Sequence, residues 1–355
     1  MRQRGIRVSS SVSRLEQLVP LALIVMIAVL PACIHPVSSD FQMYYDAGTD
    51  PLEVYTASVP GFYYLPWSLG GLWPLSFLPA KVAWGLFNSV SLILAYVSMT
   101  VVCRRGFPRM VALLRPVVAV AIWLGQWDGL LLGGALIGEY AIQSHKPALL
   151  GLALLMLSTK PQTVLPVILL CVVRALRWPA RDWGRALLPM AAAVGLSLVA
   201  LGWWPARYLQ FVQVDSPVVV HHLMSTVGDM PIDLSVPWGL RIPMIIVLAV
   251  ATWLLHKADP AGGVAFALVL GLALYPFTSV YSYVTTAPAI AWLYRSDRHL
   301  GMMAVVCEVV LVGLVALGLP GWVVPLLWTG LALLALVRSR RHPPGPSSSL
   351  DIVAQ

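Results

Sequence analysis

Hydrophobic residues occur along this chain in long continuous stretches, separated by short segments rich in charged residues, Pro and Gly. Continuous apolar stretches favour transmembrane helices over the alternating strands of a membrane β-barrel. The pattern predicts an all-α polytopic membrane protein with one domain over residues 18–341. We expect about twelve spans, several of them shorter than a full crossing, near residues 18–34, 82–103, 111–125, 129–143, 147–159, 162–176, 186–204, 236–255, 262–277, 284–294, 300–319 and 321–337.

Composition supports a membrane protein. Only 11% of the 355 residues are charged and 59% are hydrophobic, whereas soluble domains carry about 25% charged residues. These values exclude an ordinary soluble enzyme, a disordered chain and a collagen-like fibre. The net charge of +8 bears on membrane orientation, and we expect no nucleic-acid partner.

The basic residues predict the orientation. If the N-terminal segment 1–17 is cytoplasmic and the spans alternate, 19 of the 23 Lys and Arg residues lie inside, as the positive-inside rule requires. The residues left outside are Lys81, Lys160, Arg207 and Arg241. We therefore expect cytoplasmic termini and a multi-pass protein of the plasma membrane, in a bacterial cell.

Two long external segments are expected, at about 35–80 and 205–235, and loops of this length commonly carry function. Residues 61–79 are apolar but interrupted by three prolines and rich in Tyr and Trp, so we interpret them as interfacial helices rather than a span. The first apolar stretch could instead be a signal peptide, but the many later spans favour an uncleaved first span. The Pro/Ser-rich tail 342–355 is expected to be disordered.

The first external loop holds the main candidate for chemistry. Asp40 follows the first span by six residues, and Asp46 follows Asp40 among many aromatic residues. A carboxylate can take a proton from a sugar hydroxyl while aromatic rings stack on the sugar. The alternative is a solvated helix cap, because Ser38-Ser39-Asp40 resembles an N-cap.

Other polar residues interrupt apolar stretches. Lys160 precedes Pro161 at the outer side, where a helix break would let it hold a lipid phosphate; the alternative is a snorkelling lysine. Gln126 and Asp128 could bind a sugar or simply form a turn. Glu139 is interpreted as facing water near a cytoplasmic end, and Glu308 has no evident partner.

Motifs for other chemistries are not found in the sequence. The four cysteines form no CxxC pair, His221-His222 lacks a third metal ligand, and there is no Walker loop, GxGxxG or DxD. We expect no metal and no cofactor.

The order of these motifs resembles the polyprenyl-phosphate-sugar-dependent glycosyltransferases of the GT-C type, glycosyltransferase family 87, which includes mycobacterial mannosyltransferases of phosphatidylinositol mannoside synthesis. The resemblance covers roughly residues 15–190. The matching pieces are Asp40-Phe41 with Tyr44, Asp50-Pro51 with Tyr55, Tyr63-Tyr64-Leu65-Pro66, Trp73-Pro74-Leu75, Leu78-Pro79, Gly125-Gln126, Gly151 and Lys160-Pro161.

The resemblance implies a GT-C-like bundle and an inverting, metal-independent transfer with Asp40 as the general base. Lys160 and Arg241 would face the leaving lipid phosphate. The remaining substrate-binding candidates are Tyr44, Asp46, Tyr64, Gln126 and Asp128. The chain also departs from the family, because Trp127-Asp128 replaces the usual Asn and a late external His is missing near Tyr281 and Tyr283.

The sequence therefore predicts a membrane hexosyltransferase, with mannose as one candidate sugar, a polyprenyl-phosphate donor and a lipid or glycan acceptor at the cell envelope. A membrane transporter or lipid flippase is the alternative, motivated by Glu139, Glu308 and Lys160. A third hypothesis is a non-catalytic partner in an envelope-assembly complex.

Overall fold

The computed structural model describes residues 10–55, 62, 64–211, 213, 237–274 and 280–341. Tyr63, His221, His222, most of the external segment 205–235 and the tail 342–355 lie outside the described residues. Within the described ranges the chain is helical and forms no strand, which confirms the all-α class.

The first half of the chain runs from α1 to α8. Its α-helices are α1 (Ser10–Ile34), α2 (Ser39–Thr49), α3 (Leu69–Ser76), α4 (Ala80–Ser98), α5 (Gly106–Leu113), α6 (Pro116–Leu124), α7 (Asp128–Gln143) and α8 (Pro147–Leu157). Two 3-10 segments, η1 (Pro66–Ser68) and η2 (Met99–Val101), flank α3 and α4.

The second half runs from α9 to α16. Its elements are α9 (Pro161–Ala175), α10 (Ala180–Leu201), α12 (Trp238–Ala258), α13 (Pro260–Leu274), η3 (Val280–Thr286), α14 (Ala287–Ser296), α15 (Arg298–Ala316) and α16 (Val323–Arg341). Residues 204–211 are also helical.

Four described helices are long and apolar enough to cross a membrane, namely Ala80–Val101, Ala180–Leu201, Gly239–Ala258 and Arg298–Ala316. The number rises to six if the bent pairs α1–α2 and α5–α6 each count as one span. Several other apolar helices have only 10–17 residues, fewer than the roughly 20 needed for a crossing. Membrane-type helices are therefore present, while the count of twelve spans stays a prediction.

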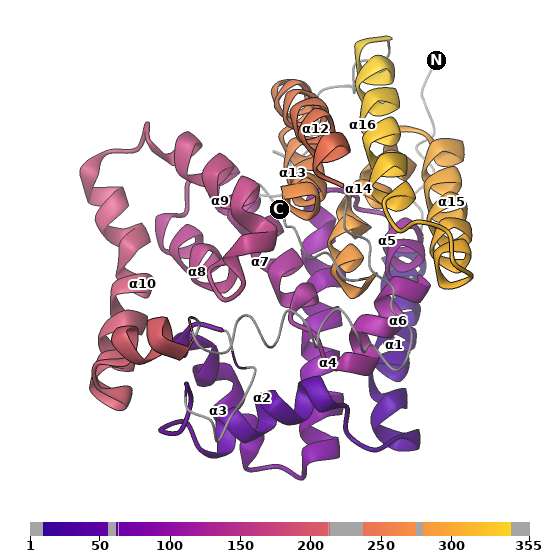
Figure 1. Cartoon of the computed structure of the whole chain (residues 1–355). Helices are drawn as coiled ribbons and strands as arrows, with labels where there is room; N and C mark the ends of the chain where they lie inside the picture. Colours follow the sequence, from indigo (N-terminus) through magenta and orange to yellow (C-terminus); the bar gives the residue numbers. More distant parts are fainter. Residues whose placement is uncertain are drawn as a thin grey trace.

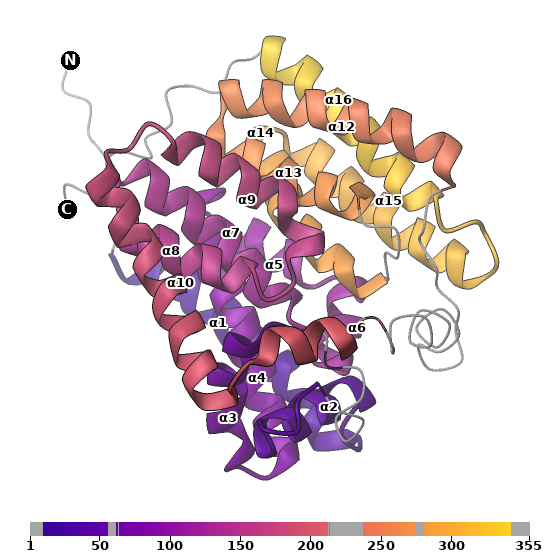
Figure 2. The same cartoon turned by 60° about the vertical axis from the view of Figure 1, so that its left-hand side comes forward.

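Among the described residues of the segment 61–79, no helix is long enough to cross a membrane. Its longest described helix is α3, with eight residues, and α3 packs against α2. The two helices lie together at one end of the molecule, at the bottom of Figures 1 and 2. The turn of 88° between α1 and α2 is compatible with the interfacial helix that the sequence predicts after the first span.

Buried apolar residues form two clusters. The larger one joins α1 and α4–α9 to α12–α16. The smaller one joins α2, α3, the start of α4 and residues 201–211, and it is rich in aromatic side chains such as Phe41, Trp84 and Trp127. The aromatic cluster supports α2 and thereby the position of Asp40.

Candidate active site

Asp40 lies in the first turn of α2, and the residues before it fix that turn. Ser38 is the N-cap: its hydroxyl accepts a hydrogen bond from the Phe41 N–H at 3.2 Å and donates to the Leu124 carbonyl at 3.0 Å. The capping role suggested for the Ser38-Ser39-Asp40 motif therefore belongs to Ser38. The Asp40 side chain remains available for other contacts.

Gln126 is the direct partner of Asp40. Its amide Nε2 donates to Asp40 Oδ2 at 2.5 Å. The preceding Gly125 ends α6 at φ +69°, and a Cβ there would lie 2.8 Å from Cβ of Phe41. Glycine therefore allows both the left-handed turn and the close approach of α2 that bring Gln126 to Asp40.

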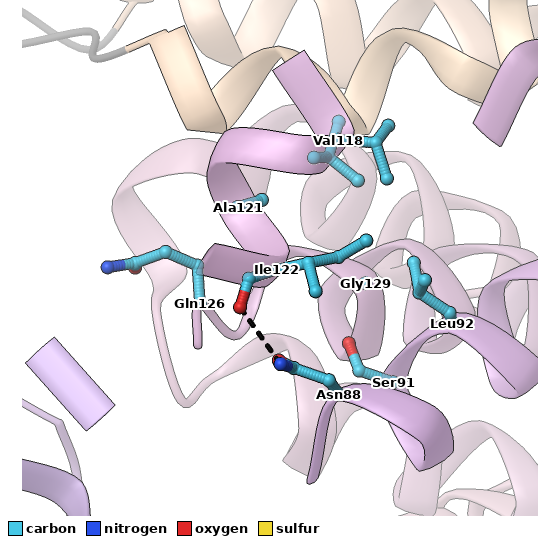
Figure 3. Close-up of a pocket in the computed structure, with 9 residues that line it drawn as sticks. Asn88, Ser91, Leu92, Val118, Ala121, Ile122, Gln126 and Gly129 are labelled. Atoms are coloured by element: carbon cyan, nitrogen blue, oxygen red, sulfur yellow. Dashed lines mark hydrogen bonds between the residues drawn. The ribbon is translucent and has the colours of Figure 1, made fainter. Parts of the chain in front are cut away.

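A small pocket lies beside this turn, between α4, α6 and α7. Asn88 spans it by donating to the Ile122 carbonyl at 2.9 Å, and Val284 of η3 contributes to its wall. Figure 3 shows the Gln126 amide pointing away from the other pocket residues. The Asp40–Gln126 contact is therefore separate from the pocket interior.

Two phenols extend the network. The hydroxyls of Tyr44 and Tyr64 lie 2.6 Å apart, and the Tyr44 hydroxyl donates weakly to Gln126 Oε1 at 3.4 Å. The Tyr55 hydroxyl donates to the Tyr64 carbonyl at 2.6 Å. The Trp127 ring packs on both Tyr44 and Tyr64, so aromatic surface lies directly beside the polar groups.

Lys160 lies in a helix break, as the Lys160-Pro161 motif predicts. It follows the end of α8 and caps α9, with Pro161 as the first helical residue. Its Nζ donates to Asp128 Oδ2 at 3.3 Å. Both side chains are buried, and Asp128 Oδ1 has no hydrogen-bond partner in the described part of the chain.

Electrostatics connect the carboxylate and the ammonium. Burial raises the pKa of the Asp40 carboxyl, and the positive charge of Lys160 partly opposes that rise. Burial also raises the pKa of Tyr44 and Tyr64, so both phenols stay protonated at neutral pH. The site thus holds one carboxylate favourable for proton transfer, one nearby cation and two neutral hydroxyls.

Sequence reasoning did not assign a role to Tyr281. Its ring centroid lies 5.0 Å from Lys160 Nζ, a cation–π distance. The alternative residue, Tyr283, has a buried hydroxyl without a partner among the described residues. Of the two tyrosines near the position of the missing family His, Tyr281 is the one that contacts Lys160. The two residues are more than 100 positions apart in the sequence, so no local pattern predicts this contact.

Asp46, one of the predicted site residues, lies apart from these contacts. Asp46 is exposed on α2 and accepts from Gln42 Nε2 at 2.7 Å. Arg241 is buried in the first turn of α12, a helix that packs mainly on α13 and α16. The contacts given above join six of the eight predicted residues in the polar cluster that we call the Asp40 site: Asp40, Tyr44, Tyr64, Gln126, Asp128 and Lys160. A role of Arg241 toward the phosphate stays a prediction.

The two acidic residues within apolar stretches have arginine partners. Glu139 is fully buried and paired with Arg174, so the expectation that it faces water is wrong. Glu308 is paired with Arg115. In the described ranges no three His, Cys, Asp or Glu side chains are grouped to hold a metal ion.

Comparison of the chain with known protein families, with characterised proteins and with solved structures finds no match. The chemistry of the Asp40 site and the sequence motifs are therefore the evidence for what this chain does.

Proposed function

We propose that this chain is an integral-membrane glycosyltransferase that moves a hexose from a polyprenyl phosphate to a lipid or glycan acceptor at the extracytoplasmic membrane surface. One observation carries the proposal: the half-buried carboxylate of Asp40 lies in the first turn of α2, within the electrostatic influence of the buried Lys160 ammonium. A base and a cation near one another are the two groups that this transfer needs.

In the proposed reaction, an acceptor hydroxyl oxygen attacks C1 of the sugar while its proton moves to Asp40. The bond between C1 and the phosphate oxygen breaks, and polyprenyl phosphate leaves with the electron pair. One displacement inverts the configuration at C1. The phosphate leaves as an anion without needing a proton, and Lys160 stabilises the charge that develops on it.

The other groups of the Asp40 site have supporting roles in this scheme. Gln126 orients the Asp40 carboxylate by donating to Oδ2. The other oxygen, Oδ1, accepts only a long hydrogen bond of 3.5 Å from the Ser39 hydroxyl and can take the acceptor proton. The neutral hydroxyls of Tyr44 and Tyr64 and the ring of Trp127 suit a sugar, which combines hydroxyl groups with an apolar face. The identity of the hexose, the identity of the acceptor and a contact of Arg241 with the phosphate are expectations of this proposal.

The transporter or flippase alternative draws less support. Its motivation was Glu139, Glu308 and Lys160 within or near apolar stretches, but the two glutamates pair with arginines, as charges with a structural role do. Uptake of a lipid or solute into vesicles without a covalent product would favour this alternative.

Asp40→Asn tests the proposal, with Asp46→Asn as the matched control on the same helix. Membranes carrying each variant are incubated with radiolabelled polyprenyl-phosphate hexoses and an acceptor lipid extract. Losing the base should slow transfer by about 100-fold or more, while Asp46→Asn should transfer at the wild-type rate. Transfer by Asp40→Asn at the wild-type rate would exclude Asp40 as the base.

A further inference from the structure

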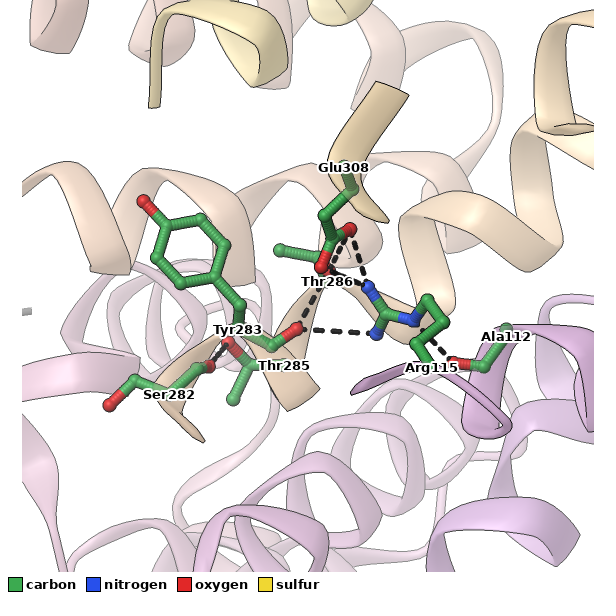
Figure 4. A network of polar contacts seen from close by, with 7 residues as sticks. All are labelled: Ala112, Arg115, Ser282, Tyr283, Thr285, Thr286 and Glu308. Carbon is green, nitrogen blue, oxygen red and sulfur yellow. Dashed lines mark hydrogen bonds and ion pairs between the residues drawn. The ribbon is translucent and has the colours of Figure 1, made fainter. Parts of the chain in front are cut away.

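A second polar cluster lies inside the helix bundle, built on Arg115 and Glu308. Arg115 Nη1 donates to both Glu308 oxygens, at 2.6 Å and 2.5 Å, and both side chains are only 1% exposed. Figure 4 shows the guanidinium between the Glu308 carboxylate and the backbone of η3. The pair joins the start of α6 to the middle of α15, although the two residues are 193 positions apart.

Such a pair is a poor source of stability. Removing two charges from water costs several kcal/mol per ion, and apolar replacements of both residues are often neutral or stabilising. A buried pair of this kind is best explained by the geometry that it specifies. The relevant question is which element the Arg115–Glu308 pair holds in place.

The contacts identify η3 as that element. Arg115 Nη2 donates to the Tyr283 carbonyl at 3.2 Å, and Nη1 also donates to the Thr286 hydroxyl at 2.8 Å. The Thr286 hydroxyl in turn donates to the Tyr283 carbonyl at 2.7 Å. Seven residues of 3-10 geometry exceed the usual run of three or four, so η3 needs such external hydrogen bonds to keep its conformation.

The η3 segment also reaches the Asp40 site. Tyr281, two residues before Tyr283, lies over Lys160. Val284, one residue after Tyr283, lines the small pocket beside Gln126. The Arg115–Glu308 pair therefore holds η3 at its Thr286 end. At the other end of η3, Tyr281 contacts the Lys160 ammonium.

We infer that the Arg115–Glu308 ion pair is a positioning device: it holds η3 in the conformation that keeps the Tyr281 ring over the Lys160 ammonium. The expected effect of this ion pair on sugar transfer rests on the proposed function. The position that it gives to η3 and Tyr281 does not depend on that function. Arg115, Glu308 and Thr286 are positioning residues. Their described hydrogen bonds join them to one another and to backbone carbonyls, and none of these bonds goes to Lys160 or Asp40.

Fluorine NMR tests the geometric part on the full-length protein in nanodiscs, with 3-fluorotyrosine incorporated at position 281. Lys160→Met should shift the fluorine resonance in the wild-type background, because the ring loses its cation. In the double variant Arg115→Met/Glu308→Leu the resonance should already be shifted or split, and Lys160→Met should change it little further. An unchanged resonance with an unchanged response to Lys160→Met would overturn the inference.

The control is a second ion pair, Glu139 with Arg174, replaced in Glu139→Leu/Arg174→Met. It joins α7 to α9 and makes no described contact with η3, so the Tyr281 resonance should stay as in wild type. If the Arg115/Glu308 double variant does not purify in folded form, Glu308→Gln removes the charge while keeping the shape, and the same shift is expected of it.

A transfer assay then separates this inference from the proposed function. The double variant should raise KM for the polyprenyl-phosphate donor by roughly tenfold, with kcat and the acidic pH limb set by Asp40 nearly unchanged. A wild-type protein that transfers no sugar would contradict the proposed function, while the fluorine result would still decide whether the ion pair positions Tyr281.

Discussion

At the scale of single residues, the properties of Asp40 come from two opposing effects. Its carboxyl is half-buried, which disfavours the charged form, while the Lys160 cation and hydrogen bonds from Ser39 and Gln126 favour it. The result is a pKa above that of an ordinary aspartate. A base with a raised pKa accepts a proton more readily and is still ionised at neutral pH unless the rise is large.

The pH dependence of transfer follows from the opposing effects of burial and of the Lys160 charge on the pKa of Asp40. Asp40 must be ionised to act as the base, so the rate falls as pH decreases through its pKa. Lys160→Met removes the charge that lowers this pKa and should therefore move the acidic limb of the kcat/KM profile to higher pH, besides slowing transfer by about 100-fold. Asp46→Asn should leave the acidic limb of the profile in place. An acidic limb that does not move in Lys160→Met would contradict the electrostatic coupling between Lys160 and Asp40.

The sequence motifs predicted much of the site at this scale. Asp40, Gln126 and Lys160 come from three distant segments, yet their motifs suggested a common site. The partners of Glu139 and Glu308 and the contact of Tyr281 could not be predicted, because they depend on which helices pack together. No local pattern specifies a contact between residues such as Arg115 and Glu308.

At the scale of elements, the position of Lys160 depends on how α8 packs. A Cβ at Gly151 of α8 would overlap the backbone carbonyl of Ala186 on α10. The glycine therefore permits close contact between these two helices. Because α8 ends three residues before Lys160, this contact also sets where the helix break lies.

Gly151→Ala should consequently destabilise the protein by about 1–3 kcal/mol through overpacking, measured as a lower midpoint of thermal unfolding in detergent. Gly195→Ala is the matched control on α10, since nothing lies within 4 Å of its added Cβ; its midpoint should stay the same or rise slightly. Equal midpoints for the two variants would mean that α8 and α10 are not packed this closely.

Hydropathy predicted these helices in the right places. The stretches 147–159 and 162–176 were expected as two short apolar segments, and the structure has the short helices α8 and α9 there, of 11 and 15 residues. The break between them lies at the polar residues before Pro161, where the sequence predicted it. The bend of α2 away from α1 is likewise set by Ser38 and by aromatic packing rather than by hydrophobicity.

At the scale of the whole molecule, the proposed function requires the Asp40 site to face away from the cytosol, because nucleotide sugars are cytosolic and lipid-linked sugars serve the outer surface. The distribution of Lys and Arg predicts this orientation. Thr49 at the end of α2 and Arg181 at the start of α10 are both exposed and are predicted to lie on opposite sides of the membrane.

Cysteine labelling checks the orientation. In a background with Cys33→Ala and Cys307→Ala, a membrane-impermeant maleimide should label Thr49→Cys in intact cells and Arg181→Cys only after permeabilisation. Cys103 and Cys171 are buried and should contribute little. The reverse labelling pattern would put Asp40 in the cytosol and contradict a lipid-linked donor at the outer surface.

The most direct test of the central claim is an electron cryo-microscopy structure of the protein with a bound polyprenyl phosphate. We predict a phosphate oxygen within about 3 Å of the Lys160 ammonium, with the Asp40 carboxylate opening onto the same cavity. A phosphate bound at the opposite membrane face, or one separated from Asp40 by packed helices, would contradict the account.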